Sequence, residues 1–412
     1  MNTISKLSLY LSLPALALAS CANAEDGETG MTKLEDELMV AKEYGTFERP
    51  WAIEFIPGSP TLAITEKAGT LKLLRTKAKG EYAIVTVSGV PEVAYGGQGG
   101  LGDIAFLESE AGSSDDTRTI FLSWAEADAS GDHYGAAVGK GKLVCTNDPK
   151  VTPENEIKCA IEALEVIWRQ APKVMGRGHY SHRLELSPDE KYLFIASGDR
   201  QKQKPAQNLE NNMGTIVRLN LDGTPAEGNP FADQGGITKE IWSYGHRNIL
   251  GMDFAPDGRL WEVEHGPAGG DELNLVKEAN NYGWPVRSNG DNYNGIDIPD
   301  HTEDDGFTKP AIHWTPVIAP GDMVFYSGKM NSSWKGDAFI PGLGSKALVR
   351  VEIDGDTATE AARYDLGGRL RSVAEGPDGS ILVVQDGEDA KLFRIALMPP
   401  IVPPAPRSMD TE

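Results

Sequence analysis

A short pattern recurs along this chain and constrains its fold more than any other feature. Alternating apolar and polar residues lead into Pro-Asp-Gly or a related turn at residues 51–58, 184–190, 252–258 and 373–379, and a second short apolar run follows each turn. Period-2 runs around such a turn predict β-hairpins. Hairpins at long, roughly regular spacing indicate a series of repeated antiparallel sheets.

The length of the chain fits this repeat. The residues that follow Ala24 divide into six units of about 65 residues, which suits four-stranded propeller blades with insertions. We therefore predict an all-β fold, a six-bladed β-propeller of four-stranded antiparallel blades over residues 46–397. An array of β-sandwiches is the alternative, and residues 157–170 are the best candidate for a helix.

The charge of the chain excludes several partners. It carries 61 Asp and Glu against 39 Lys and Arg, a net charge of −22, and has no basic run. A nucleic-acid binder needs an excess of Lys and Arg for phosphate contacts, and electrostatic attraction to anionic lipid needs the same. We therefore expect no nucleic-acid partner and no membrane contact through charge.

The N-terminal segment, residues 1–24, has the features of an export signal. Lys6 provides the positive charge, an apolar stretch covers residues 7–19, and small residues follow. Residues 18–21 resemble a bacterial lipobox, which would make Cys21 a lipidated N-terminus, and cleavage after Ala24 is the competing interpretation. Both predict a periplasmic protein, and the first adds an outer-membrane anchor. We expect a linker at residues 25–45 and a Pro-rich, disordered tail at residues 398–412.

Two cysteines, Cys145 and Cys159, remain in the mature chain. In an oxidising periplasm, an even pair at this spacing predicts one disulfide bond. Two buried free thiols are the alternative. Because the sequence has no Cys-x-x-Cys-His, it does not attach haem covalently.

Three segments contain more glycine and polar residues than strands require. The first, residues 95–103, surrounds Gln98 with glycines and has no Lys, so neither a P-loop nor a dinucleotide fingerprint fits. It is either a flexible loop or a backbone that approaches a flat ligand, with Gln98 as a polar contact.

The second segment places two histidines, His179 and His182, at the start of a predicted hairpin. Asp199 ends the partner strand, so that it can meet His179 across the pair. A carboxylate that accepts from one imidazole nitrogen leaves the other nitrogen free to act as a base. Two structural histidines are the alternative, and zinc is disfavoured because no third ligand lies nearby.

The third segment spans residues 242–285. Its adjacent Arg247 and Asn248 suit an anionic, oxygen-rich ligand. Residues 266–272 offer the backbone carbonyls and carboxylates that Ca²⁺ takes, although their spacing is not that of an EF-hand. A solvated turn is the alternative for this acidic loop.

Together these segments resemble the PQQ-dependent soluble aldose sugar dehydrogenases of the glucose/sorbosone type. The similar motifs occur in family order, from about residue 51 to residue 395, at residues 96–102, 179–184, 243–248, 264–274, 281–285 and 368–373. The resemblance implies a six-bladed propeller with PQQ over its central axis and with bound Ca²⁺.

The resemblance also implies roles for individual residues. His179 is similar to the general base that takes the proton of the sugar C1 hydroxyl while hydride passes to PQQ and a lactone forms. Asp199 would orient His179, and Arg247 would stabilise charge on the quinone oxygen. Further implied PQQ contacts are Gln98, Asn248, Trp314, Arg369 and Arg371. The implied metal ligands are the carbonyls of Gly266 and Pro267 for a Ca²⁺ beside PQQ, and Glu272 and the Tyr282 carbonyl for a second Ca²⁺.

The chain departs from the family pattern at several positions. Gly178 stands where glucose-oxidising members have an acid, so the residue that implies a preference for glucose is missing. Gly344 stands where they have a PQQ-contacting lysine, with Lys346 two residues further on. Val317 takes the place of a Thr or Ser, and His182 takes the place of a small residue near the proposed base.

Two other functions compete with this interpretation. A calcium-dependent lactonase or esterase can use the same fold, but it needs carboxylates around an axial Ca²⁺ rather than Arg-Asn and Arg-x-Arg pairs. A non-catalytic binding propeller gives no reason for His179, Asp199 and Arg247 to converge. For a dehydrogenase, the expected partners are a small aldose and a separate electron acceptor.

Overall fold

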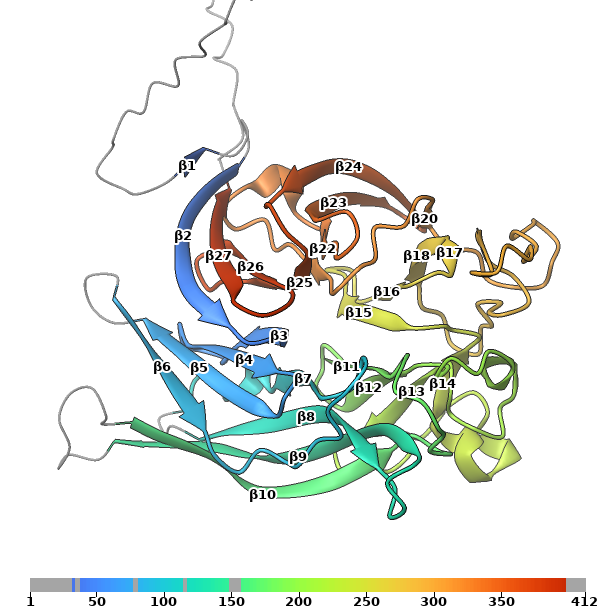
Figure 1. Cartoon of the computed structure of the whole chain (residues 1–412), viewed down its shortest axis with the longest axis horizontal. Coiled ribbons are helices and arrows are strands. Elements are labelled where there is room, and N and C mark those ends of the chain that lie inside the picture. Colours follow the sequence, from blue (N-terminus) through green and yellow to red (C-terminus); the bar gives the residue numbers. More distant parts are fainter. Residues whose placement is uncertain (1–31, 34–37, 77–80, 114–116, 148–156, 398–412) are drawn as a thin grey trace, which may run out of the picture.

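The computed structural model is a ring of β-sheets around a central axis (Figure 1). It describes residues 32–33, 38–76, 81–113, 117–147 and 157–397. These residues form six main antiparallel sheets, which confirms the predicted six-bladed β-propeller. In the same part of the chain, no helix is long and apolar enough to cross a bilayer. The predicted export signal, Cys21 and the Pro-rich tail lie outside the described residues.

The first three blades each contain four strands and follow one another along the chain. The first consists of β3 (Pro50–Phe55), β4 (Leu62–Glu66), β5 (Thr70–Thr76) and β6 (Tyr82–Val87). The second consists of β7 (Leu101–Phe106), β8 (Thr117–Ala127), β9 (Tyr134–Asn147) and β10 (Ile157–Arg169). The third consists of β11 (Ser181–Leu186), β12 (Tyr192–Ser197), β13 (Thr215–Asn220) and β14 (Ile241–Tyr244).

The last three blades complete the ring. The fourth consists of β15 (Ile249–Phe254), β16 (Leu260–Glu264), β18 (Asp271–Leu275) and β20 (Ile312–Trp314). The fifth consists of β21 (Val324–Phe325), β22 (Ala338–Pro341), β23 (Ala347–Asp354) and β24 (Thr357–Asp365). The sixth consists of β25 (Leu370–Glu375), β26 (Ile381–Gln385), β27 (Ala390–Leu397) and the N-terminal β2 (Leu38–Phe47), with β1 (Thr32–Lys33) beyond it.

Small elements lie between the blade strands. A two-stranded sheet pairs β17 (Ala268–Gly269) with β19 (Gly290–Asp291). The short 3₁₀ helices are η2 (Glu108–Glu110), η3 (Lys204–Gln207), η4 (Ala232–Gln234), η5 (Gly236–Glu240) and η6 (Ser332–Trp334). The four predicted hairpins correspond to the two innermost strands of the first, third, fourth and sixth blades.

The structure corrects two predictions. Part of the expected linker is the strand β2, whose residues from Leu38 onward pair with β27 and close the sixth blade. The predicted helix at residues 157–170 is the strand β10. Register shifts interrupt its pairing with β9 between Glu162 and Glu165 and again between Val166 and Trp168. Each bulge moves the apolar side by one residue, so the strand alternation imitates a helical spacing.

The predicted disulfide bond between Cys145 and Cys159 is present. The two cysteines are directly opposite each other in β9 and β10, at the outer side of the second blade. Closing a loop of this length stabilises a folded chain by about 3 kcal/mol.

The core lies between the blades, because each sheet is apolar on both faces. In β12, Leu193 and Ile195 pack against the second blade, while Phe194 and Ala196 pack against the fourth. One such cluster fills each of the six contacts between neighbouring blades. This alternation within short strands explains why the sequence shows period-2 patterns without helical ones.

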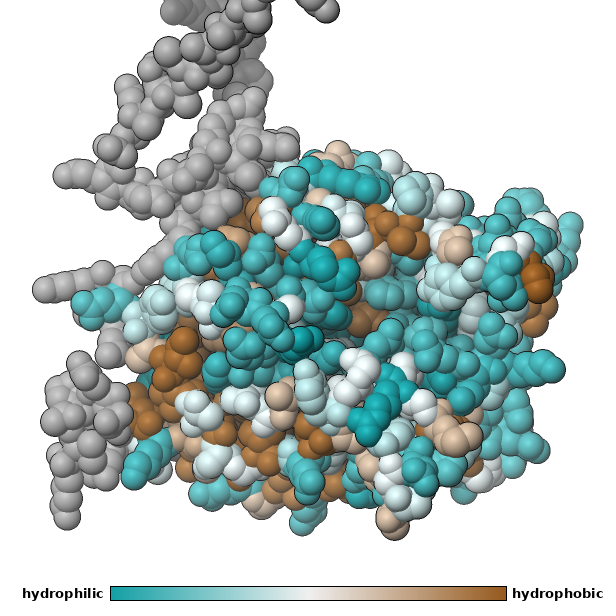
Figure 2. Space-filling model, in the orientation of Figure 1, coloured by the Kyte–Doolittle hydropathy of each residue, from teal (hydrophilic) through white to brown (hydrophobic). Residues whose placement is uncertain are grey.

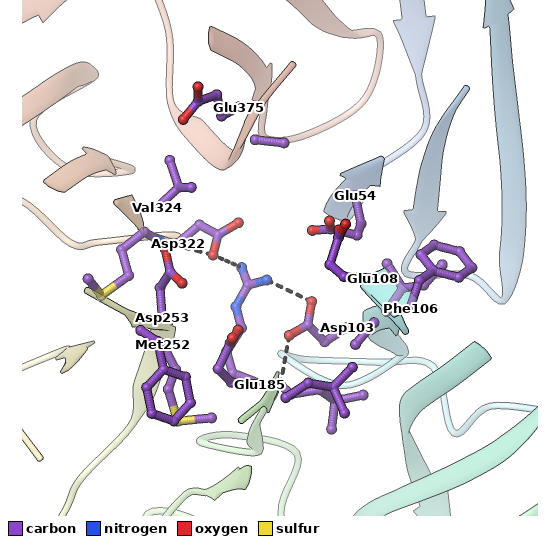
Figure 3. Close-up of a pocket in the computed structure, with 18 of the residues that line it drawn as sticks. Glu54, Asp103, Phe106, Glu108, Glu185, Met252, Asp253, Asp322, Val324 and Glu375 are labelled. Carbon is purple, nitrogen blue, oxygen red and sulfur yellow. Dashed lines mark hydrogen bonds and ion pairs between the residues drawn. The ribbon is translucent and has the colours of Figure 1, made fainter. Parts of the chain in front are cut away.

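The innermost strands, β3, β7, β11, β15, β21 and β25, surround the axis, and each contacts the next. Their N-terminal ends meet at a cavity of about 170 Å³, which we call the basic cavity. Their C-terminal ends surround a larger hollow of about 360 Å³, which we call the acidic channel (Figure 3). On the face shown in Figure 2, hydrophilic residues gather around the middle of the ring.

Candidate active site

The basic cavity is formed by segments that lead into the innermost strands. Five of the six predicted motifs contribute to it, those at residues 96–102, 179–184, 243–248, 264–274 and 368–373. The cavity is lined by Trp51, Lys67, Gln98, Tyr180, Ser181, His182, Asn248, Leu250, His265, Leu343, Arg369 and Arg371. It therefore has three cationic side chains in its wall and no carboxylate.

His179 and Asp199 meet at the entrance to the third blade, as predicted. His179 Nδ1 lies 2.7 Å from Asp199 Oδ1, and Trp284 Nε1 donates to Asp199 Oδ2 over 2.8 Å. The backbone N–H groups of Gln201 and Gln203 also donate to this carboxylate. Because Asp199 accepts from Nδ1–H, the Nε2 of His179 keeps its lone pair.

The electrostatic surroundings keep this pair in the form needed for a base. Burial lowers the pKa of His179, and the positive charge of the nearby Arg247 lowers it further. The hydrogen bond to Asp199 raises this pKa but does not offset the other two effects. Burial would raise the pKa of Asp199, but the hydrogen bonds from His179 and Trp284 hold it below the usual value. At neutral pH the site therefore contains a neutral imidazole beside a carboxylate.

The backbone around His179 is held in an unusual conformation. His179, Ser181 and His182 have φ values of 47°, 55° and 53°, in the left-handed region that non-glycine residues rarely occupy. Gln98 Oε1 accepts the backbone N–H of His179 over 2.6 Å, which links the glycine-rich segment to the proposed base. Such strain is typical of sites where a side chain must point in one direction.

Arg247 lies beside the base and retains a free donor. Its Nη1 donates to the His265 carbonyl over 3.0 Å, while its buried Nε has no hydrogen-bond partner. The carboxylate of Glu264 accepts from the backbone N–H groups of both Arg247 and Asn248, at 2.6 and 3.0 Å. A buried guanidinium nitrogen without a partner is costly, which suggests an anionic or carbonyl ligand at this point.

The Arg-x-Arg pair and a lysine supply the positive charge of the cavity. Arg369 Nε and Arg371 Nη2 bind the two oxygens of Asp386, at 3.0 and 2.9 Å. Lys67, which follows β4, donates to the Gly97 carbonyl, and burial together with Arg371 lowers its pKa. Lys346, next to the position where the family has its lysine, is exposed and does not line the cavity.

The second imidazole, His182, is part of the cavity wall. It is buried, its Nδ1 lies 2.8 Å from Ser123 Oγ, and its ring stacks on Trp51 at 4.8 Å. Burial and the neighbouring Arg183 lower its pKa to about 3, so it is neutral. A side chain at Gly102 would collide with this ring, since a Cβ there would lie 1.9 Å from it.

The predicted calcium ligands are only partly gathered. Gly266, Glu272 and Tyr282 line one small cavity of about 10 Å³, together with Arg247 and Glu264, and Pro267 is not in its wall. Burial, followed by the charge of Glu264, raises the pKa of Glu272 well above its usual value. A space of this size holds a single small ion or a water molecule.

Trp314 is a correction. It lies in β20, the outermost strand of the fourth blade, and its Nε1 donates to Glu360 Oε2 over 2.7 Å. Its ring belongs to the core between the fourth and fifth blades. Trp314 therefore does not line the basic cavity. His179 and Arg247 do not line it either, but each adjoins a lining residue: Gln98 accepts the His179 backbone N–H, and Arg247 directly precedes Asn248.

Sequence reasoning missed Lys67, His265 and Trp284. Trp284 belongs to a motif that assigns it no role of its own, yet its Nε1 donates to Asp199 and holds that carboxylate in place. Lys67 follows the second strand of a hairpin that the repeat had already identified, as Asp199 follows β12. Comparing the residues that follow the second strand of each hairpin therefore indicates Lys67 as a site residue.

Comparisons with known proteins agree with this geometry. Residues 47–394 match the family model described as glucose/sorbosone dehydrogenase. The chain is 34% identical to the aldose sugar dehydrogenase YliI of Escherichia coli strain K12 over 393 residues, which cover 94% of this chain and 98% of that protein. It is 26% identical to quinoprotein glucose dehydrogenase B of Acinetobacter calcoaceticus over 284 residues, which cover 51% of this chain and 59% of that protein.

A solved structure gives the same result. The crystal structure of the soluble aldose sugar dehydrogenase of Escherichia coli, in the apo form, superposes with a TM-score of 0.75 at 34% identity, covering 87% of this chain and 98% of that one. The ring of six blades, the buried pair of His179 and Asp199 and the basic cavity are thus found in a chain that belongs to the glucose/sorbosone dehydrogenase family.

Proposed function

We propose that this protein oxidises aldose sugars at C1 to lactones, with PQQ and Ca²⁺ as cofactors. The observation that carries the proposal is the neutral imidazole of His179, held by Asp199 beside the free donor of Arg247. The names of its relatives, an aldose sugar dehydrogenase and a quinoprotein glucose dehydrogenase, support the same chemistry.

The basic cavity fits a flat polyanion such as PQQ. Lys67, Arg369 and Arg371 supply three positive charges, of which Asp386 offsets one by pairing with both arginines, and no carboxylate lines the wall. Gln98 and Asn248 add neutral polar groups that suit carbonyl or ring-nitrogen atoms. A lactonase would need carboxylates around an axial Ca²⁺. None lines the basic cavity, and in the acidic channel the guanidinium of Arg183 already pairs with Asp103 and Asp322, which disfavours that alternative.

The residues of this chain would each do a defined part of the reaction. PQQ, when bound, supplies the two-electron acceptor for the hydride of the sugar C1. His179 Nε2 takes the proton of the C1 hydroxyl, and Asp199 stabilises the resulting imidazolium through Nδ1–H. The guanidinium of Arg247 stabilises negative charge that develops opposite the base.

The Ca²⁺ part of the proposal rests on oxygen atoms around the third segment. The carbonyl of Gly266 and the carboxylate of Glu272 line the same small cavity. These are hard oxygen ligands of the kind that Ca²⁺ prefers. We propose that Glu272 and the Tyr282 carbonyl hold a structural ion in this cavity, and that the carbonyls of Gly266 and Pro267 hold another ion outside it, next to the cofactor.

We further propose that the protein works in the periplasm and passes its electrons to a separate acceptor. The signal-like residues 1–24 and the disulfide bond between Cys145 and Cys159 support an exported protein, because such bonds persist in oxidising compartments. A lipid anchor at Cys21 is part of this proposal.

Reconstitution tests the function. Apoprotein supplied with PQQ and Ca²⁺ should reduce a redox dye in the presence of aldoses, and no sugar-dependent reduction would refute the proposal. His179→Ala should lower kcat by about 10²–10⁴-fold while PQQ still binds. The exposed His313 provides the control, since His313→Ala should keep full activity; a His179→Ala variant that turns over normally would disprove the role of the base.

A further inference from the structure

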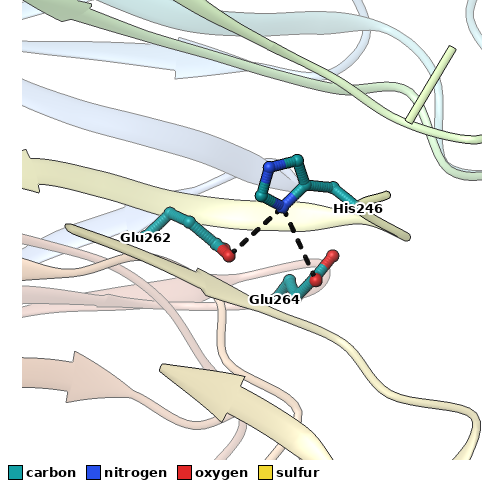
Figure 4. Close-up of side chains that lie close together, drawn as sticks. All are labelled: His246, Glu262 and Glu264. Carbon is teal, nitrogen blue, oxygen red and sulfur yellow. Dashed lines mark ion pairs between the residues drawn. The ribbon is translucent and has the colours of Figure 1, made fainter. Parts of the chain in front are cut away.

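A second group of buried polar side chains lies between the third and fourth blades, outside the basic cavity. His246 follows β14, and Glu262 and Glu264 belong to β16 (Figure 4). Each residue offers one ligand atom, and these three atoms, His246 Nδ1 and one oxygen from each carboxylate, lie within 4.8 Å of one another. His246 and Glu262 are 0% exposed and Glu264 is 4% exposed.

This group has unsatisfied atoms that point to a missing cation. His246 Nδ1 and Glu262 Oε2 are buried without hydrogen-bond partners. Among the ion pairs of the described residues, His246 is the only cationic side chain that faces either carboxylate. Two buried carboxylates next to an imidazole nitrogen are costly unless a positive charge lies between them.

The distances are too long for direct hydrogen bonds, and the shorter of the two lies in the range expected between ligands of one metal ion. His246 Nδ1 lies 3.5 Å from Glu262 Oε1 and 3.8 Å from Glu264 Oε1. A direct N–H···O bond would be about 2.7–3.2 Å long. Tetrahedral ligands at about 2.0–2.2 Å from one ion are separated from each other by roughly 3.2–3.6 Å.

The imidazole is also oriented as a metal ligand. Its other nitrogen, Nε2, lies 2.9 Å from Ser243 Oγ, which can accept the Nε2–H. In that tautomer Nδ1 has a free lone pair directed at the carboxylates. Histidines that bind metals are commonly held in this way through their second nitrogen.

We propose that His246 Nδ1, Glu262 and Glu264 bind one divalent transition-metal ion, of which Zn²⁺ is the typical example. The imidazole nitrogen distinguishes this site from the all-oxygen sites that Ca²⁺ prefers. The ion would fix the contact between the third and fourth blades. It would also fix Glu264, whose other oxygen holds the backbone of Arg247 and Asn248.

The site adjoins the calcium site proposed at Glu272 and Tyr282, because Glu264 also lines that cavity and the His246 ring stacks on Tyr282 at 4.5 Å. Glu272 is paired across the strands with Glu264, and its Oε2 accepts from Asn274 Nδ2 over 3.3 Å. The competing occupant of the new site is a proton on His246 Nδ1. Burial lowers the pKa of His246, but the two carboxylates more than offset this effect and raise the pKa to about 9.

Metal binding to the full-length protein tests the proposal. After removal of metals and in the presence of excess Ca²⁺, the protein should bind one equivalent of Co²⁺ with the visible absorption of a tetrahedral nitrogen–oxygen site, and Zn²⁺ should displace it. Glu262→Gln and His246→Gln should lose this equivalent. His301, whose side chain is 3% exposed and faces the carboxylate of Asp305, serves as a matched control, and His301→Gln should keep it.

The spectrum of the wild-type protein with Co²⁺ tests the proposal even if a variant fails to fold. Absence of Co²⁺ and Zn²⁺ binding in the wild-type protein would show that Nδ1 carries a proton and would overturn the proposal. A Co²⁺ spectrum that persists in Glu262→Gln would also overturn the proposal, and its loss in Glu272→Gln alone would assign the ion to the calcium site instead. Neither measurement depends on PQQ or on sugar oxidation.

Discussion

The two hollows on the axis are formed by the same innermost strands, yet they carry opposite charges. The basic cavity, at the N-terminal ends, has three cationic side chains and no carboxylate. The acidic channel, at the C-terminal ends, has eight carboxylates and one guanidinium, that of Arg183. Figure 3 shows Glu54, Glu185 and Asp253 around the middle of this channel.

Arg183 separates the two regions. Its guanidinium stacks on Trp51 in the wall of the basic cavity, and it pairs with Asp103 at 2.9 Å and with Asp322 at 3.3 Å in the wall of the channel. It also donates to the backbone carbonyls of Leu250 and Gly321. The comparison teaches that one short innermost strand can line two hollows of opposite charge. Its N-terminal residues line the cationic cavity, and residues a few positions further on line the anionic channel.

The difference also explains how a protein with a net charge of −22 can attract a polyanion. The positive charge is concentrated at one end of the axis, in a cavity where the surrounding protein, with a lower dielectric constant than water, focuses its field. The channel at the other end repels the same ligand. An anionic cofactor therefore has one favourable approach to the axis.

Replacing the separating arginine should have the largest effect. Arg183→Met leaves Asp103 and Asp322 buried without their cation, and we expect a loss of about 3–5 kcal/mol in unfolding free energy. Urea denaturation measures it. Arg259→Met, which breaks ion pairs with the exposed Asp257 and Asp356 and a hydrogen bond to the Gly355 carbonyl, should cost about 0–1 kcal/mol. Similar losses in the two variants would show that Arg183 is not a structural divider.

Removing charge from the basic cavity should weaken PQQ binding. Arg371→Gln removes a guanidinium that is suited to a carboxylate, and we expect a loss of about 1.5–3 kcal/mol, roughly 10- to 150-fold in Kd. Fluorescence titration with PQQ measures it. Glu375→Gln in the acidic channel is the matched control. If both variants bind PQQ equally well, the assignment of the cofactor to the basic cavity is wrong.

The lysine of the cavity should contribute less. Lys67→Met should weaken PQQ binding by about 1 kcal/mol, roughly fivefold, because its charge is partly solvated. Lys346→Met should have no effect, since that side chain is exposed outside the cavity. The reverse result, with Lys346 as the sensitive position, would restore the lysine that the family resemblance suggested.

The smallest effect concerns stability and pH in the acidic channel. Burial raises the pKa of Asp253 to about 7 and that of Glu185 well above its usual value. Carboxyls with a raised folded-state pKa stabilise the fold below their unfolded pKa, and this contribution is lost as the pH rises through the folded-state pKa. Glu185→Gln should therefore raise the melting temperature near pH 8 and leave it unchanged near pH 4. The exposed Glu303→Gln should change neither, and an equal response of both variants would contradict this account.

The propeller and much of the site could be predicted because their signals are local. Gln98, His179, Arg247 and Arg369 occur in segments that lead into innermost strands, so their convergence follows from the repeat. Trp314 was assigned to the cofactor from a motif alone, and its place on an outermost strand could not be read from spacing.

Other features depend on packing that no short segment reveals. The bulges of β10 gave apolar residues the spacing of a helix. The second and fifth blades lack the Pro-Asp-Gly signal, so only the division of length indicated them. The pairing of β2 with β27 joins residues from the two ends of the described chain, and this partner could not be deduced from either segment.

That pairing has a consequence for the order of folding. Leu38 pairs with Leu397, so the ring closes only when almost the whole chain is available. Loop closure over such a distance costs about 5 kcal/mol in entropy, and contacts this remote form slowly. A chain that emerges with its N-terminus first would hold an open arc of blades until its last strand arrives. The cofactor cavity, which needs Gln98 and Arg371 together, would be completed at this final step.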